Sequence, residues 1–260
     1  MAKAFAEQGM QLALIDIDAV KLADAQKAFD EAGVTAKTWQ VDITEMAAVK
    51  AAVGDARQAL GSINVVCANA GVSGIMKPLN EISVEDWDWI VDVNIKGALY
   101  TVQSCLPFLM ENPNEAHIVI TSSISGLRVH EPSRHQGMYN TTKFAMVGFG
   151  EALKVDLAEH GIGVSILCPG VVNTDISHSA RNRPAKYGGA VETSEGHDLA
   201  KLAASGTDPL QFGRWVLKAI KLNRLHVITH PEGRGQVAAR HERILAAFDA
   251  SGDITGCTSG

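Results

Sequence analysis

The segment Ile63-Asn-Val-Val-Cys-Ala-Asn-Ala-Gly71 indicates the fold class of this chain. It is a short apolar run that ends in a polar turn, as strands of a parallel sheet covered on both faces do. Five more runs have the same character: Gln11–Asp16, Thr35–Val41, His117–Ser122, Gly163–Cys168 and Leu225–Thr229. Helix-like stretches separate these runs. The alternation predicts an α/β fold, a doubly wound parallel sheet with helices on both faces.

Glycines and periodic apolar residues mark the helices between the strands. Four glycines end a helical pattern just before a strand, as left-handed helix caps do: Gly9, Gly33, Gly61 and Gly161. Long helices are predicted over residues 83–109 and 139–160. No linker, repeat or low-complexity segment divides the chain, so we predict a single domain over residues 1–260.

The composition excludes several classes of protein. The chain has 260 residues, 46% of them apolar, which is enough for one large α/β domain. A net charge of −6 argues against a nucleic-acid or anionic-membrane surface. The apolar runs are too short to span a bilayer, and the first residues do not form a signal-peptide pattern. The cysteines show no disulfide framework and no C-x-x-C spacing, so a cytoplasmic location is predicted.

The segment Tyr139-Asn-Thr-Thr-Lys143 carries the candidate chemistry. Residues four apart share one face of a helix, so the Tyr139 hydroxyl and the Lys143 ammonium can meet in one site. A cation about 5 Å away at an effective dielectric near 20 favours a phenolate by roughly 3 kcal/mol, or about two pKa units. We therefore expect Lys143 to lower the pKa of Tyr139 and to make it an acid and base at neutral pH. Ser123, at the end of an apolar run upstream, can donate to a substrate oxygen.

The order of five motifs resembles that of the classical short-chain dehydrogenases/reductases: Cys67-Ala-Asn-Ala-Gly71, Val93-Asn-Ile-Lys-Gly97, Ser122-Ser-Ile-Ser-Gly126, Tyr139-Asn-Thr-Thr-Lys143 and Pro169-Gly-Val-Val-Asn-Thr174. The resemblance extends from Met1 to about His230. It implies a Rossmann-type fold and an NAD(P)-dependent oxidoreductase that interconverts a secondary alcohol and a ketone. The catalytic residues that it implies are Asn94, Ser123, Tyr139 and Lys143.

The same resemblance implies a set of residues that bind the cofactor: Asp16, Asp42, Ile43, Asn69, Ala70, Gly71, Tyr139, Lys143, Pro169, Gly170, Val172 and Thr174. The Asp16 carboxylate, at the end of a strand, can accept both ribose hydroxyls of an adenosine and would repel a 2′-phosphate. The alternative is that Asp16 or Asp18 only caps the next helix, and we assign the cap to Asp18. For Asp42 the alternatives are a bond to the adenine ring and a helix cap. No arginine adjoins Asp16 in the sequence, so NAD is predicted over NADP. No metal is predicted.

The chain departs from the family pattern at its beginning. The family starts with a strand and a glycine-rich turn of the type T-G-x-x-x-G-x-G, and residues 1–9 resemble the helix that follows that turn. Since the strand lies in the middle of the family's sheet, we expect its two neighbours to be separated, with unpaired edges. A non-catalytic binding or scaffold protein that has lost dinucleotide binding is therefore the alternative function. A sugar-nucleotide epimerase or dehydratase is a third, disfavoured because such chains usually carry a larger substrate domain.

The remaining expectations concern substrate and assembly. The segment 171–207 is polar and long for a connection, and the resemblance favours a substrate lid over a solvated loop there. This segment and the loop 127–138 would set the choice of alcohol or ketone. The family also implies a homo-oligomer, a dimer or tetramer, through the helices over residues 87–109 and 139–160. Four apolar residues on these helices are candidates for burial between subunits: Leu99, Val102, Phe149 and Leu153.

Overall fold

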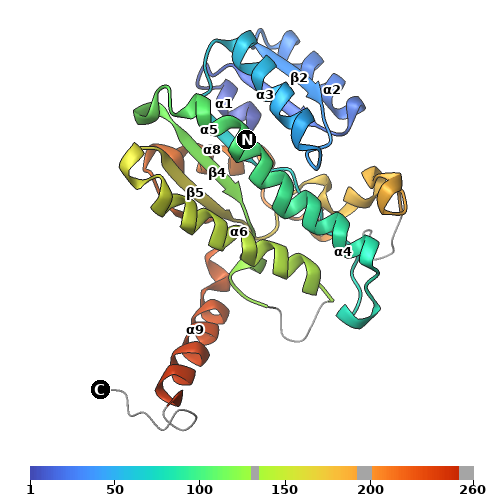
Figure 1. Cartoon of the computed structure of the whole chain (residues 1–260), viewed down its shortest axis with the longest axis vertical. Helices are drawn as coiled ribbons and strands as arrows, with labels where there is room; N and C mark the ends of the chain where they lie inside the picture. The colour runs from blue at the N-terminus through green and yellow to red at the C-terminus, as the bar shows by residue number, and fades with distance from the viewer. Residues whose placement is uncertain (130–134, 192–200, 252–260) are drawn as a thin grey trace.

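Parallel strands form the centre of the protein in a computed structural model, which describes residues 1–129, 135–191 and 201–251 (Figure 1). The strands are β1 (Leu12–Asp16), β2 (Ala36–Gln40), β3 (Val65–Ala68), β4 (His117–Thr121), β5 (Gly163–Cys168) and β6 (His226–Ile228). Every pairing between them is parallel. Each strand lies within a run that the sequence predicted, which confirms the α/β class.

The sheet is divided into two parts. In the described chain, β1 pairs only with β2, and the other strands form a second sheet in the order β3-β4-β5-β6. The smaller sheet, with α2 and α3, makes up the blue region at the top of Figure 1. This division confirms the expected separation of two neighbouring strands, here β1 and β3. A cavity of about 660 Å³ lies between β1 and β3 and is lined by both.

Helices cover both faces of the strands, as predicted. One core packs α3 (Met46–Leu60), α5 (Ala98–Leu109) and α6 (Gly137–Asp156) against β3, β4 and β5. The other core packs α1 (Ala2–Ala6), α2 (Ala19–Glu31) and α8 (Pro209–Lys221) against the opposite face. The four cap glycines have φ values of 77°, 68°, 81° and 74°, in the left-handed region that favours glycine.

The predicted long helix over residues 83–109 has three parts. It begins with α4 (Val84–Val91), where the Ser83 hydroxyl accepts the N–H of Asp86 at 3.1 Å. A π-helical segment, η2 (Asp92–Gly97), then leads directly into α5. Such wide turns inside helices are frequent at functional sites.

Two of the four residues proposed to lie between subunits face the core of their own chain. Val102 and Leu153 are buried in the cluster beneath β3, β4 and β5, because the helix faces that carry them point at the sheet. Leu99 and Phe149 remain half-buried. For Val102 and Leu153 the prediction was wrong.

The last described helix, α9 (Arg234–Asp249), projects away from the rest of the protein (Figure 1). No residue of α9 is buried, although Arg240 lies over the ring of Phe144 in α6, 4.8 Å from its centre. None of the described helices is long and apolar enough to cross a membrane.

Candidate active site

The predicted site residues gather in one pocket at the carboxyl ends of the strands. The pocket has a volume of about 810 Å³. Its lining includes Asp16, Asp42, Ile43, Asn69, Ala70, Gly71, Ser123, Tyr139, Lys143, Pro169, Gly170, Val172 and Thr174. Parallel sheets bind ligands at this edge, where the strands deliver their last residues into one crevice. Asn94 is the only predicted site residue that does not line the pocket.

Lys143 lies at the floor of the site. It stands one helical turn after Tyr139 on α6, and its Nζ is 5.5 Å from the centre of the Tyr139 ring. The side chain is buried, and Nζ donates to the carbonyl oxygen of Thr121 at 3.0 Å. Burial lowers the pKa of Lys143 to about 8, because an ammonium is poorly solvated there.

The prediction that the pKa of Tyr139 is lowered was wrong for the chain without a ligand. Burial raises the pKa of Tyr139 above its ordinary value, and a hydrogen bond with the Ser123 side chain opposes that rise only in part. The physical reason is that the phenolate loses more solvation than its neighbours return. Tyr139 therefore keeps its proton at neutral pH.

Hydrogen bonds between side-chain hydroxyls and backbone groups fix the position of Ser123 relative to α6. Ser123 is buried at the end of β4, where its hydroxyl accepts the N–H of Ser125 at 3.1 Å. The neighbouring Ser122 hydroxyl donates to the carbonyl oxygen of Lys143 at 2.7 Å. A side chain at Gly126 would collide with that same carbonyl group. Ser122 and Gly126 thus fix the distance between Ser123 and the Tyr139 helix, a role that sequence reasoning missed.

Asn94 fastens the segment after β3 to α6. Its Nδ2 donates to the carbonyl oxygen of Val72 and to the Thr142 hydroxyl, both at 3.0 Å, and its Oδ1 accepts the N–H of Val72 at 2.8 Å. Asn94 is buried within the π-helical segment η2. The structure therefore gives Asn94 a positioning role beneath the pocket.

Gly71 lets the backbone approach the reacting groups. A Cβ atom at this position would lie 3.2 Å from Oδ1 of Asn94 and 3.5 Å from Nζ of Lys143. The space above Gly71 is therefore open only because the side chain is absent. This supports the prediction that residues 69–71 pass close to a bound cofactor.

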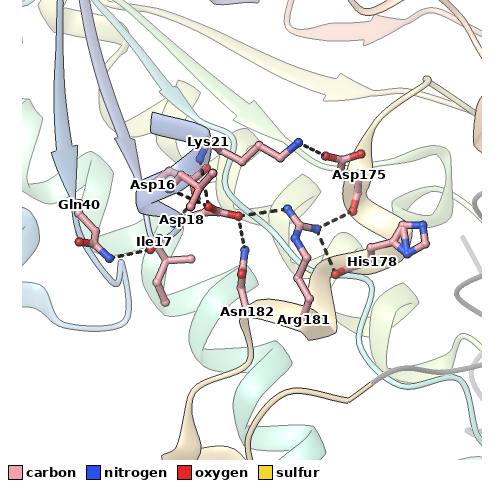
Figure 2. Close-up of polar contacts among 10 residues, drawn as sticks. Asp16, Ile17, Asp18, Lys21, Gln40, Asp175, His178, Arg181 and Asn182 are labelled. Carbon is pink, nitrogen blue, oxygen red and sulfur yellow. Dashed lines mark hydrogen bonds and ion pairs between the residues drawn. The ribbon is translucent and has the colours of Figure 1, made fainter. Parts of the chain in front are cut away.

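The loop after β1 carries the acidic end of the pocket (Figure 2). Asp16 is exposed at the end of β1, and its Oδ1 accepts the N–H of Asp18 at 2.9 Å. Asp18 caps α2 by accepting the N–H groups of Val20 and Lys21, each at 3.1 Å, which confirms the cap assignment. Asp18 also binds Arg181, whose guanidinium lies 3.5 Å from Oδ2.

No arginine adjoins Asp16 in the sequence, but the fold brings Arg181 to the same loop, where it binds Asp18. It comes from the predicted lid, far along the sequence, and Figure 2 shows it reaching the same loop. Its guanidinium is occupied by Asp18 and by the carbonyl oxygen of His178 at 3.1 Å. Lys21 is occupied as well, by Asp175 at 3.0 Å.

Asp42 has a structural role in the chain without a ligand. Its Oδ1 accepts both the N–H of Thr44, at 2.9 Å, and the hydroxyl of Thr44, at 2.8 Å. Lys186 of the predicted lid lies 3.5 Å from Oδ2. The helix cap that was the alternative for Asp42 is not formed, because α3 has Glu45 at its N-cap position and no side-chain cap hydrogen bond. The Asp42 carboxylate lines the pocket.

The segment after β5 forms the opposite wall. The N–H of Gly170 donates to Nδ1 of His230 at 2.9 Å, and a Cβ atom at Gly170 would collide with the His230 ring. The backbone of Val172 pairs with Thr207, so the two ends of the predicted lid lie side by side. His230 thus holds the backbone that carries Val172 and Thr174.

A buried ion pair anchors the described part of the predicted lid, residues 171–191 and 201–207; residues 192–200 and the centre of the loop 127–138 lie outside the described chain. Arg183 binds Asp86 of α4 at 2.6 Å, with both side chains less than 10% exposed. The guanidinium also lies 5.4 Å from the centre of the Trp89 ring. Tyr187 adds a hydrogen bond to Asp92 at 2.7 Å. No local pattern pointed to these contacts, because their partners are far apart in the sequence.

The buried ammonium predicts an unusual dependence of stability on pH. Below pH 8 Lys143 is charged in both the folded and the unfolded chain, so its lowered pKa destabilises the fold in full. As the pH rises from about 8 toward the ordinary lysine value, the folded chain loses its proton first and this destabilisation disappears. Lys143→Met should therefore raise the free energy of unfolding by about 2 kcal/mol at pH 7, after subtracting the lost bond to Thr121, and by less than about 1 kcal/mol at pH 9.5.

Urea denaturation at the two pH values measures this difference. The control variant Lys50→Met replaces an exposed lysine and should show no comparable change in the free energy of unfolding. A Lys143→Met protein less stable than the parent at pH 7 would show that the ammonium stabilises the fold.

Comparison with known proteins agrees with this geometry. A family described as short chain dehydrogenase matches residues 1–185. A CLA biosynthesis dehydrogenase/reductase of Lactiplantibacillus plantarum is 30% identical over 264 residues, which cover 98% of this chain and 90% of that protein. A C alpha-dehydrogenase of Sphingobium sp. strain SYK-6 is 27% identical over 247 residues, 94% of this chain and 80% of that protein.

A solved structure with the same fold belongs to a short chain dehydrogenase/reductase from Burkholderia phymatum in complex with NAD. Its TM-score is 0.86 at 32% identity, and the match covers 94% of this chain and 90% of that one. The chain described here therefore belongs to the short chain dehydrogenase family, and its class is that of an oxidoreductase with a Rossmann-type fold.

Proposed function

We propose that the protein interconverts a secondary alcohol and a ketone, with NAD as the hydride carrier. The observation that carries the proposal is the pocket in which Ser123, Tyr139 and Lys143 meet the glycine-lined backbone at Gly71. These residues fit a nicotinamide dinucleotide: the Asp16 carboxylate lies at one end, and the backbone after β5 lies at the other. When bound, the cofactor supplies or accepts the hydride.

The chain's own residues handle the proton and the substrate oxygen. The Ser123 hydroxyl donates to that oxygen, which becomes an alkoxide as hydride is transferred. Tyr139 supplies a proton to it in ketone reduction, and its raised pKa keeps that proton available at neutral pH. Lys143 holds its position through Thr121 and places a positive charge beneath the ring.

The proposal is tested by turnover on a panel of secondary alcohols and ketones, followed through the absorbance of the reduced cofactor. At least one alcohol or ketone of the panel should show turnover that requires both the substrate and the cofactor. A non-catalytic protein would show no cofactor-linked turnover with any compound of the panel, while its fold remained intact.

Asp16 should set the preference for NAD over NADP. A 2′-phosphate about 4 Å from a carboxylate, at an effective dielectric near 20, is repelled by roughly 4 kcal/mol per unit charge. Asp16→Ala should therefore reduce the ratio of kcat/KM for NAD to that for NADP by at least about tenfold. Asp24→Ala, which removes an exposed carboxylate from α2, is the matched control. An unchanged ratio in Asp16→Ala would show that Asp16 does not select between the two cofactors and serves only in the turn that it forms with Asp18.

The proposal also includes assembly and location: the protein forms a homo-oligomer, a dimer or tetramer, in the cytoplasm. Leu99 on α5 and Phe149 on α6 support it, because both keep exposed apolar surface after Val102 and Leu153 have turned inward. Light scattering on the folded protein measures the mass, and a monomer at micromolar concentration would contradict the assembly.

A further inference from the structure

A short helical segment of the predicted lid, η6 (Asp175–Asn182), bridges two walls of the active-site pocket and lines it. On one side, the Arg181 guanidinium lies 3.5 Å from Oδ2 of Asp18, in the loop after β1 (Figure 2). On the other side, the Ser179 hydroxyl accepts the N–H of Ser73 at 3.1 Å, in the segment after β3. The segment η6 therefore connects the loop after β1 with the segment after β3 across the pocket.

The charged side chains of the pocket are unevenly distributed. Among the described residues that line it, the acids are Asp16, Asp42, Asp175 and Glu232, and the arginines and lysines are Arg128, Lys143 and Arg181. Lys143 lies beneath the Tyr139 ring, and the Arg128 side chain extends toward Gly233, after β6. In the described lining, Arg181 is therefore the cation that faces the loop after β1.

Arg181 is bonded more closely to its own segment than to the loop that it faces. Its Nη1 donates to the carbonyl oxygen of His178 at 3.1 Å, whereas the 3.5 Å between Nη2 and Asp18 exceeds the usual length of a hydrogen bond. Asp18 also accepts from Nδ2 of Asn182 at 3.2 Å, and it caps α2.

Asp18 does not depend on the guanidinium for its charge. Its pKa is lowered first by the hydrogen bond from the backbone N–H of Lys21, so the carboxylate stays ionised without Arg181. The Arg181 side chain is 38% exposed. The guanidinium can therefore exchange Asp18 for another anion at little cost to the fold.

We propose, on the basis of the function proposed above, that the Arg181 guanidinium binds the diphosphate of the nicotinamide dinucleotide in exchange for Asp18. A diphosphate joins the two nucleosides, so it has to lie between the adenosine end of the pocket at Asp16 and the end formed by the backbone after β5. The segment η6 covers that interval, and its Asp175 carboxylate and Asp16 would repel a phosphate without a cation nearby. A planar guanidinium donates two parallel hydrogen bonds to phosphate oxygens, which are stronger than a single contact of 3.5 Å.

This contact would make Arg181 a residue that selects for a diphosphate-linked nucleotide. It would also fasten η6 over the bound cofactor, because His178 keeps the guanidinium attached to that segment. The part of the predicted lid beside β1 would then respond directly to cofactor binding.

Isothermal titration calorimetry with ADP and adenosine tests the proposal, since ADP carries the diphosphate and adenosine lacks it. Arg181→Gln removes the positive charge and should weaken ADP binding at least about tenfold at low salt, as expected for one charge-assisted contact. Adenosine binding should change less than about twofold. Because the readout is binding, Arg181-dependent binding of ADP in a protein that turns over no alcohol or ketone would contradict the redox function and still support the diphosphate contact.

Two variants separate the charge of Arg181 from the position of η6. Arg214→Gln removes an exposed guanidinium from α8, outside the pocket lining, and should leave ADP binding unchanged. Lys21→Met breaks the Lys21–Asp175 pair, which also holds η6, without removing a charge from the pocket lining. Equal losses of ADP affinity in Lys21→Met and Arg181→Gln would overturn the proposal, since the position of η6 would then account for the effect.

Three other results would also overturn it. One is a parent protein that binds ADP no more tightly than adenosine. Another is an equal loss of ADP and adenosine binding in Arg181→Gln, which would place the effect at the adenosine end. The third is a greater effect of Arg181→Gln on 2′-AMP than on ADP, because Arg181 would then serve a 2′-phosphate beside Asp16.

Discussion

Replacing Tyr139 with phenylalanine is expected to lower kcat by at least about a thousandfold while leaving the fold intact. The phenolic oxygen is the only atom removed, and it is the group proposed to exchange a proton with the substrate oxygen. The Tyr139 ring packs against the cluster around Trp89 and Met138, and phenylalanine keeps that packing. The free energy of unfolding should therefore change little. Turnover is measured on a preparation that reduces a ketone with NADH.

Tyr100→Phe is the matched control, since it removes a half-buried phenol from α5, away from the pocket. It should retain the kcat of the parent. If Tyr139→Phe kept that kcat on the same ketone, Tyr139 would not be the proton donor.

The largest expected effect on stability is at the buried pair Arg183–Asp86. Arg183→Met keeps an apolar chain against Trp89 but leaves the Asp86 carboxylate buried without its partner. Breaking a buried pair from one side costs roughly 3–5 kcal/mol, because the remaining charge is uncompensated. Urea denaturation of Arg183→Met should show a loss of this size.

Two further variants identify the cause of that loss. Arg183→Met combined with Asp86→Leu removes both charges and should recover much of the stability. Lys21→Met breaks an exposed pair, with side chains 57% and 62% exposed, and should cost no more than about 1 kcal/mol. A loss below about 1 kcal/mol in Arg183→Met itself would show that the pair does not anchor the predicted lid.

The strands and most of the site could be predicted from local patterns. Each apolar run ends at the same edge of the sheet, so the residues that follow the runs, such as Gly71, Ser123 and Gly170, had to meet there. The spacing of Tyr139 and Lys143 fixed their common face in the same way, since helix geometry acts over one turn.

Contacts between distant segments were not predictable in this way. Arg181 reaches Asp18, and His230 supports Gly170, through chain segments whose meeting depends on the whole fold. The predicted direction of the Tyr139 pKa shift was also wrong, because the sequence shows a neighbouring charge but not the depth of burial. The inward faces of Val102 and Leu153 are a third case, since an apolar residue on a helix fits a sheet and a subunit contact equally well.

Two sets of contacts made by the predicted lid should respond differently to ionic strength. On the side of β1 and β2 its contacts are solvent-exposed pairs, such as Lys21–Asp175 and Lys186–Glu45, which salt screens over a Debye length of about 8 Å at physiological concentration. The Arg183–Asp86 pair is closed off from solvent and is screened much less. Rising salt therefore loosens the contacts beside β1 and β2 and leaves Arg183 attached to α4. The salt concentration of an assay thus sets how freely that end of the pocket exchanges with bulk water.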